Sequence, residues 1–179
     1  MKQNNIKFNF YSKNYVVTGG GKGIGFSTVT KLYDSGANVA LMTRSESDIK
    51  KIKKKFSGKR IIAFCGDVSK HEDRDEFYKI VKKKMKSIDG LINNAGIRQR
   101  KKFELITHTD LDAIYENNLK SVFFFNTKIF KDFKKKYRLY CEYCINCWPN
   151  WICRFKWLCI IKKWYNWFNQ ISSSRSCQT

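Results

Sequence analysis

Three glycines in the run Thr18–Gly25, which reads T-G-G-G-K-G-I-G, have the spacing of a loop that holds a phosphate group. The run follows a short apolar stretch and precedes residues 24–33, whose apolar side chains recur at helical spacing. In that setting Gly19 allows a tight turn, Gly23 lets the backbone approach a pyrophosphate, and Gly25 lets the helix pack closely on the strand. Taken alone the run is equally compatible with a flexible turn, so the surrounding elements decide between the two.

Strands and helices alternate along the first 137 residues. Short, mostly apolar runs predict four buried strands, at 14–17, 38–42, 60–64 and 90–92. Helical spacing predicts four helices, at 24–33, 45–56 with Ser45 as N-cap, 72–85, and 109–133 with an apolar stripe of Leu111, Ile114, Tyr115, Leu119 and Val122. Strands and helices joined by short loops in this order indicate a doubly wound α/β domain with a parallel sheet of about four βα units.

Three further motifs follow the glycine loop in a fixed order. Asp67-Val68 follows the third predicted strand, Asn93-Asn94-Ala95-Gly96 follows the fourth, and Asn118 lies in the last helix within N-N-L-K-S-V-F-F. Together with T-G-x-x-x-G-I-G, they resemble the short-chain dehydrogenase/reductase family over residues 14 to about 136. Within that family the sequence looks most like 3-oxoacyl-carrier-protein reductases and related sugar or steroid alcohol dehydrogenases. The resemblance implies a Rossmann-like fold.

The resemblance also implies a chemistry, which is hydride transfer between a nicotinamide and a carbonyl or alcohol. In the family a Tyr phenol acts as general acid or base, a Lys four residues later lowers its pKa and binds the nicotinamide ribose, and a Ser holds the substrate oxygen. Asn118 matches the fourth member of this tetrad, which fixes a kink and a water in the proton path. The implied cofactor-binding residues are Gly19, Lys22, Gly23, Ile24, Gly25, Arg44, Asp67, Val68, Asn94, Ala95 and Gly96.

The end of the second predicted strand favours NADP(H) over NAD(H). It reads Thr43-Arg44, where relatives that prefer NAD place an Asp for the ribose hydroxyls. Lys22 in the glycine loop adds a second cation near the expected 2′-phosphate. The alternative interpretation is that both are ordinary surface charges.

The composition changes abruptly after the last predicted helix. All five Trp lie between Trp148 and Trp167, and five of the seven Cys lie between Cys141 and Cys159. The catalytic Ser and the Tyr-x-x-x-Lys pair that the family resemblance calls for do not occur in this stretch. Three interpretations compete. They are an aromatic interaction tail, a frameshift, and a metal or cluster site built from Cys141, Cys144, Cys147 and Cys153.

The genetic code favours the frameshift. Trp has a single codon, and each of the five Trp codons read one base later becomes a Gly codon. In that shifted frame, permitted codons place a Ser at Ile145, a Tyr at Leu158 and a Lys at Lys162, four residues after the Tyr. We therefore interpret 1–136 as the NADP-binding half of the family's domain. We interpret 137–179 as an irregular, out-of-frame tail that forms no domain, so this chain is expected to lack dehydrogenase activity and to bind no metal.

The formal net charge is +21, from 36 Lys and Arg against 15 Asp and Glu, which would suit a polyanionic partner. The excess consists mostly of Lys in short runs, and the chain is also rich in Asn, Ile, Phe and Tyr. These residues have A- and T-rich codons, so genome composition accounts for the excess and we expect no nucleic-acid partner. A basic nucleic-acid-binding protein and a cofactor-binding regulatory module stay open as rival classes.

Targeting signals are not visible in the sequence. The first fourteen residues lack an apolar core segment, and the apolar stretch at 145–161 is broken by Arg154 and Lys156, so no signal peptide and no membrane association are expected. The isolated Cys65 fits a reducing cytoplasm. The expected partner of the full-length ancestral enzyme is a small carbonyl or alcohol substrate, and the homo-oligomer usual in the family is doubtful for an incomplete domain.

Overall fold

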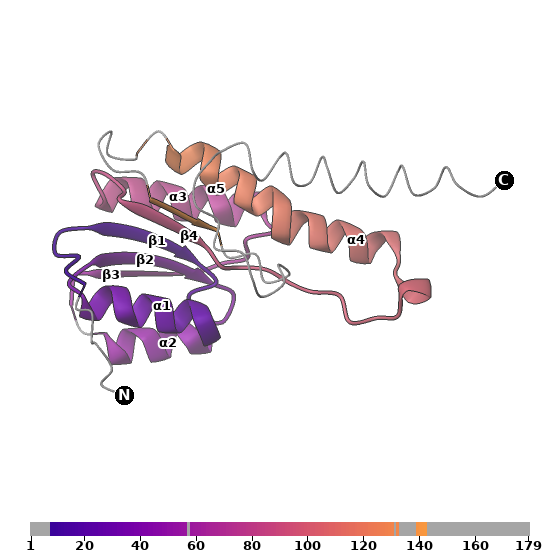
Figure 1. Ribbon diagram of the computed structural model, residues 1–179, viewed down its shortest axis with the longest axis horizontal. Coiled ribbons are helices and arrows are strands. Elements are labelled where there is room, and N and C mark those ends of the chain that lie inside the picture. Colours follow the sequence, from indigo (N-terminus) through magenta and orange to yellow (C-terminus); the bar gives the residue numbers. More distant parts are fainter. Residues whose placement is uncertain (1–7, 57, 131, 133–138, 143–179) are drawn as a thin grey trace, which may run out of the picture. The chain divides into compact units, whose positions relative to one another are not determined.

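The structure, a computed structural model, describes residues 8–56, 58–130, 132 and 139–142 of the 179-residue chain. Its parallel sheet consists of β1 Asn14–Thr18, β2 Asn38–Thr43, β3 Ile61–Cys65, β4 Gly90–Asn93 and β5 Leu139–Glu142. The order across the sheet is β3-β2-β1-β4-β5, so the direction in which strands are added reverses between β1 and β4 (Figure 1). In open α/β sheets, ligands bind where the order reverses in this way, outside the carboxyl ends of the strands.

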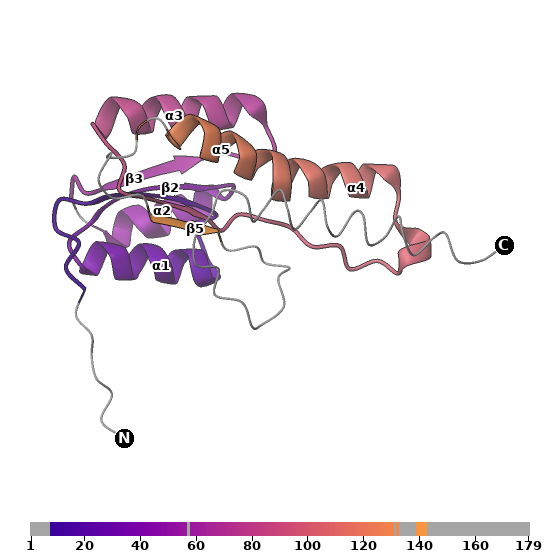
Figure 2. The same cartoon turned by 45° about the horizontal axis from the view of Figure 1, so that its top comes forward.

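Helices cover both faces of this sheet. The helical elements are α1 Gly23–Asp34, α2 Glu46–Lys55, α3 His71–Lys84, the 3-10 helix η1 Phe103–Leu105, α4 His108–Tyr115, the π-helix η2 Glu116–Lys120 and α5 Ser121–Phe130. Figures 1 and 2 show α1 and α2 on one face, and α3 and α5 on the other. No helix in the described part of the chain is long and apolar enough to cross a membrane.

Alternate strand residues supply two hydrophobic clusters, one on each face. Val16 belongs to the cluster under α3 and α5, which also contains Phe77 and Phe125 with their ring centroids 6.0 Å apart. Val17, the next residue, belongs to the cluster under α1 and α2. Because successive strand side chains point to opposite faces, a strand segment buried on both sides must be apolar throughout, as residues 15–17 of β1 and 39–42 of β2 are.

The sequence predicted most of these elements to within one residue. The four predicted strands and the first three predicted helices are all present with ends that differ by at most one position. Ser45 caps α2 as predicted, because its hydroxyl oxygen accepts a hydrogen bond from the Asp48 amide at 3.3 Å. The doubly wound, Rossmann-like parallel fold is therefore confirmed for this part of the chain.

The prediction that the chain turns irregular after position 136 was wrong for residues 139–142. These residues form β5, which pairs in parallel with β4 from Gly90 opposite Leu139 to Asn93 opposite Glu142. The outer edge of β4 carries backbone N–H and C=O groups that need partners, and any extended segment supplies them whatever its side chains. The rest of the proposed out-of-frame tail, 143–179 with every Trp, lies outside the described residues.

The helix predicted at 109–133 is present as one continuous helical run over residues 108–130. The sequence did not predict its π-helical turn η2, which inserts an extra residue between α4 and α5. Of the predicted apolar stripe, Leu111 is 58% exposed and Tyr115 is 49% exposed, whereas Val122 is buried. Downstream of the π-helix, Phe124, Phe125 and Ile129 are buried as well as Val122, and these three belong to the cluster on the face that α3 covers.

Replacing Phe77 tests this packing. The Phe77 ring is 0% exposed and contacts the rings of Phe64 and Phe125, so Phe77→Ala is expected to lower the free energy of unfolding by about 3–5 kcal/mol. Phe123→Ala is the matched control, because this ring is 61% exposed, and its effect is expected to stay within about 0.5 kcal/mol. Urea unfolding followed by circular dichroism measures both, and equal losses would contradict the described core.

Candidate functional site

The loops that follow β1 and β4 are joined at the point where the strand order reverses. The buried hydroxyl oxygen of Thr18, the last residue of β1, accepts hydrogen bonds from the backbone amides of Asn94 and Ala95, both at 3.1 Å. In the opposite direction, the Asn94 side-chain nitrogen donates to the carbonyl oxygen of Gly19 at 2.9 Å. The glycine loop and the Asn93–Gly96 loop therefore form one hydrogen-bonded unit, although Gly19 and Asn94 are 75 positions apart in the sequence.

The glycines of this unit have distinct geometries. Gly19 has a φ of 66°, and a Cβ atom there would lie 2.8 Å from the Cα atom of Ala95, so the turn accepts no side chain. A Cβ on Gly25 would overlap the carbonyl oxygen of Gly19, because α1 packs directly on the loop. Gly23 has a φ of 56° but a Cβ there would meet no described atom within 4 Å, so its backbone borders open space.

The N-terminus of α1 is left open toward that space. In the described part of the chain, the N-cap residue Lys22 makes no side-chain capping hydrogen bond, and the first turn of α1 contains no acidic residue. By contrast, α2 has the Ser45 cap and two acidic residues in its first turn. The Ile24 side chain is 56% exposed beside the helix start. Unpaired N–H groups and the helix dipole together make such a terminus attractive to an anion.

The loops after β2 and β3 bring Arg44 and Asp67 together. An Arg44 guanidinium nitrogen lies 3.7 Å from a carboxylate oxygen of Asp67, and the Arg44 side chain is 61% exposed. The other Asp67 oxygen accepts hydrogen bonds from the backbone amide and the hydroxyl of Ser69, at 2.9 and 2.8 Å. Partial burial by itself raises the pKa of Asp67, but the Ser69 hydrogen bonds and Arg44 outweigh it and lower the pKa below its usual value. The carboxylate is therefore ionised at neutral pH.

Asn118 lies in η2 and fixes the chain beyond β4. Its side-chain nitrogen donates to the Ile97 carbonyl oxygen at 2.7 Å, and its side-chain oxygen accepts from the Ile97 amide at 2.8 Å. Within η2 the Asn117 side chain donates to the Ala113 carbonyl oxygen at 2.9 Å. The π-helix therefore presents Asn118 to the loop that follows Gly96, and this contact occupies both polar atoms of the amide.

The predicted site residues all lie at the carboxyl ends of β1, β2, β3 and β4, or in η2. The structure joins Gly19 to Asn94, Arg44 to Asp67, and Asn118 to Ile97, while Lys22 and Ile24 face outward. The Val68 side chain is 5% exposed and belongs to the core cluster, so only its backbone is available to a ligand. Sequence reasoning missed Thr18, although its place as the last strand residue before the glycines was a usable signal.

Metal binding was a competing interpretation of the cysteines. Among the described residues, no group of three or more His, Cys, Asp and Glu side chains could hold a metal ion. Cys144, Cys147 and Cys153 lie outside the described residues, and of Cys141 only the backbone in β5 is described.

Comparison with known proteins identifies the family. The family model described as short chain dehydrogenase matches residues 13–138. The chain belongs to the short-chain dehydrogenase family. The match agrees with the range of 14 to about 136 over which the sequence motifs resemble that family.

Individual relatives are similar over the same part of the chain. The 3-oxoacyl-[acyl-carrier-protein] reductase FabG of Staphylococcus epidermidis is 32% identical over 117 residues, which are 63% of this chain and 47% of that protein. Carbonyl reductase [NADPH] 2 of Sus scrofa is 33% identical over 118 residues, which are 66% of this chain and 46% of that protein. The chain thus spans about half the length of the curated relatives that it matches.

A solved structure extends the likeness to the fold. The crystal structure of a short-chain dehydrogenase/reductase, a glucose/ribitol dehydrogenase from Brucella melitensis, superposes with a TM-score of 0.70 at 26% sequence identity. The match covers 75% of this chain and 58% of that chain. The Rossmann-like arrangement of the described strands and helices is therefore that of the family.

Substitution of Thr18 tests the hydrogen-bonded unit at the strand reversal. Thr18→Val keeps the shape but removes the acceptor for the buried Asn94 amide and the partly buried Ala95 amide, so the free energy of unfolding is expected to fall by about 1–3 kcal/mol. The Asn94 and Ala95 amides are expected to lose protection in hydrogen-exchange measurements. Thr18→Ser keeps the hydroxyl and is the control. Protection of both amides in Thr18→Val equal to the unsubstituted chain would contradict the described geometry.

Proposed function

We propose that this chain carries the cofactor-binding part of an NADP(H)-dependent oxidoreductase that transfers hydride to or from a carbonyl or alcohol. The observation that carries the proposal is the open N-terminus of α1, which starts at Gly23 directly beside the reversal of strand order. Backbone N–H groups and the helix dipole there suit a pyrophosphate, and no acidic side chain of the first turn opposes it. The family match supports the same assignment.

The remaining cofactor contacts are assigned residue by residue. Gly23 leaves space for the diphosphate because a Cβ there would meet no described atom within 4 Å, and Arg44 is exposed enough to meet a 2′-phosphate. Asp67 and the Val68 backbone face the adenine side, where Ser69 keeps the Asp67 carboxylate oriented. When bound, the nicotinamide supplies or accepts the hydride. The pig relative whose name includes NADPH supports this choice of cofactor.

The substrate class is a ketone, a 3-oxoacyl thioester or the corresponding alcohol. The names of the staphylococcal and pig relatives, a 3-oxoacyl-carrier-protein reductase and a carbonyl reductase, support this class. Asn118 holds the loop at Ile97 and is the one member of the family's tetrad that this sequence matches. Without a positioned Tyr no side chain exchanges a proton with the substrate oxygen, so this chain is proposed to lack dehydrogenase activity.

The missing residues are proposed to be encoded in the same gene in a shifted reading frame. The obligatory conversion of five Trp codons to Gly codons and the recovered Tyr-x-x-x-Lys spacing support the frameshift. In the restored frame the positions of β5 would also form a strand, one that leads to the catalytic Ser.

Removal of the Arg44 charge tests the cofactor preference. Arg44→Ala is expected to weaken binding of adenosine 2′,5′-bisphosphate about tenfold, equivalent to about 1.4 kcal/mol, because a charge-assisted contact to the 2′-phosphate is lost. Binding of adenosine 5′-monophosphate, which lacks that phosphate, is expected to stay within about twofold. Lys51→Ala removes the same charge from the exposed face of α2 and is the control. Calorimetric titration measures all three proteins. Equal losses for Arg44→Ala and Lys51→Ala would show that only net charge matters.

Restoring the reading frame tests the catalytic half of the proposal. A single-base insertion or deletion in the codons of Lys134, Lys135 and Lys136 returns the downstream sequence to the frame that encodes Ser and Tyr-x-x-x-Lys. NADPH oxidation with ketones and 3-oxoacyl thioesters is expected only from the restored protein. General acid–base catalysis alone contributes about 10²- to 10⁴-fold, so the difference lies well above detection limits. Equal turnover by the two proteins would refute the frameshift account of function.

A further inference from the structure

Arg74 is a buried cation that the family assignment does not explain. Its side chain is 3% exposed, and one guanidinium nitrogen donates to two backbone carbonyl oxygens, that of Val68 at 2.7 Å and that of Ser69 at 3.0 Å. The aromatic ring of Phe124 lies 5.3 Å from the guanidinium carbon. Through these hydrogen bonds Arg74, a residue of α3, fixes the turn that carries Asp67. Asp67 is the residue assigned to the adenine side.

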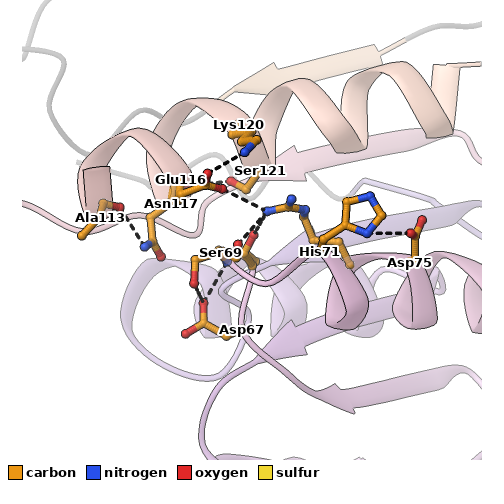
Figure 3. Close-up of polar contacts among 11 residues, drawn as sticks. Asp67, Ser69, His71, Asp75, Ala113, Glu116, Asn117, Lys120 and Ser121 are labelled. Atoms are coloured by element: carbon orange, nitrogen blue, oxygen red, sulfur yellow. Dashed lines mark hydrogen bonds and ion pairs between the residues drawn. The ribbon is translucent and has the colours of Figure 1, made fainter. Parts of the chain in front are cut away.

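The carboxylate nearest to Arg74 among the described ion pairs belongs to Glu116, the first residue of η2. A Glu116 oxygen lies 3.9 Å from the same guanidinium nitrogen, and the other Glu116 oxygen pairs with Lys120 at 2.6 Å. Figure 3 shows Glu116 on the helical segment that also carries Asn117 and Ser121, facing the turn with Asp67 and Ser69. One buried charge thus contacts the turn after β3 and the π-helix that contains Asn118.

The energetics make this contact costly to lose. A guanidinium withdrawn from water needs compensation from hydrogen-bond acceptors and an anion, and loss of one partner leaves an uncompensated buried charge. Compensation of Arg74 is already incomplete, because its Nε atom is buried without a hydrogen-bond partner in the described part of the chain. We therefore expect removal of the Glu116 carboxylate to displace the Arg74 guanidinium, which would withdraw the donor from the Val68 and Ser69 carbonyl oxygens.

We propose that Arg74 and Glu116 are positioning residues that couple the adenine-side turn at Asp67–Ser69 to the π-helix that orients Asn118. The proposal rests on the proposed function, which places a nucleotide cofactor against the first of these segments. The Asp67–Ser69 turn and the π-helix with Asn118, which contribute to opposite ends of the site, are then held in one relative position. Disturbing either segment disturbs the other through the buried guanidinium.

Amide hydrogen exchange reports on each segment without any ligand. The Ser69 amide donates to Asp67 at 2.9 Å and reports on the adenine-side turn, whereas the Ile97 amide donates to Asn118 at 2.8 Å and reports on the π-helix. If the two segments are coupled, a substitution in one segment changes the exchange rate of the amide in the other. Glu116→Gln is expected to speed exchange of the Ser69 amide about tenfold, and Arg74→Met is expected to do the same to the Ile97 amide. The double variant is expected to resemble the worse single variant, because both substitutions break one shared contact.

Lys120→Met is the matched control. The Lys120 side chain is half exposed and is the other partner of Glu116. Its replacement leaves the Arg74 contact in place, so both amides are expected to exchange within about twofold of the unsubstituted rate. The same full-length proteins are titrated with adenosine 2′,5′-bisphosphate. Arg74→Met and Glu116→Gln are expected to weaken its binding about tenfold, and Lys120→Met less than about twofold.

The proposal would be overturned if each substitution changed exchange only in its own segment. If Arg74→Met disturbs only Ser69 and Glu116→Gln disturbs only Ile97, each residue supports its own segment alone. Should Arg74→Met fail to fold, Glu116→Gln decides by itself, and loss of the fold in that variant would also overturn the proposal, because the pair would then be a general stabiliser. Failure of the unsubstituted chain to bind the bisphosphate would refute the proposed function, while the ligand-free exchange rates would still decide the coupling.

Discussion

The parallel pairing of β1 with β4 is the constraint on which the rest of this structure depends. It runs from Tyr15 opposite Gly90 to Thr18 opposite Asn93, and it brings two loops side by side at the carboxyl edge of the sheet. Parallel strands leave their loops at the same edge, so every chemically informative residue that follows a strand reaches one end of the domain. The Thr18 hydroxyl then fixes the two loops to one another by accepting two backbone hydrogen bonds.

The helices of the domain differ in how their N-termini are capped, and the difference indicates their roles. A serine and acidic residues cap α2, and a capping box between Thr107 and Asp110 closes α4. Such caps satisfy the first backbone N–H groups of a helix and neutralise its dipole. The start of α1 has neither device in the described structure, and Gly23 keeps its approach clear of side-chain atoms. Of the three helix starts of α1, α2 and α4, only that of α1 is thus left available to an anionic ligand.

The fifth strand shows how weakly sheet completion depends on side chains. The segment 139–142 reads L-Y-C-E and lies at the beginning of a stretch with an abnormal composition, yet it pairs with β4 along its whole length. Backbone hydrogen bonds supply this pairing, and an unpaired edge on a parallel sheet is costly. A chain whose downstream side chains no longer suit the fold can therefore still extend the sheet by one short strand.

The sequence by itself determined the elements of the domain and the family to which it belongs. Apolar runs in β1 and β2, the spacing of Gly19, Gly23 and Gly25, and the order of the later motifs are local signals, because each depends on residues a few positions apart. Local signals also identified Ser45 as a cap. The frameshift interpretation came from the genetic code applied to the amino-acid sequence. It concerns residues that, apart from β5, lie outside the described part of the chain.

Only the tertiary structure decided which distant residues meet. The bonds from Asn94 and Ala95 to Thr18, and those from Ile97 to Asn118, depend on the order of strands in the sheet and on the path of the loop after β4. Burial along the long predicted helix has the same origin. An amphipathic stripe predicts that a helix has a buried side, but only the packing of α5 on the sheet decides that Val122, Phe125 and Ile129 are buried while Leu111 and Tyr115 of α4 stay exposed. Arg74 illustrates the limit most clearly, because an arginine in a helix rich in charges reads as solvated until the fold encloses it.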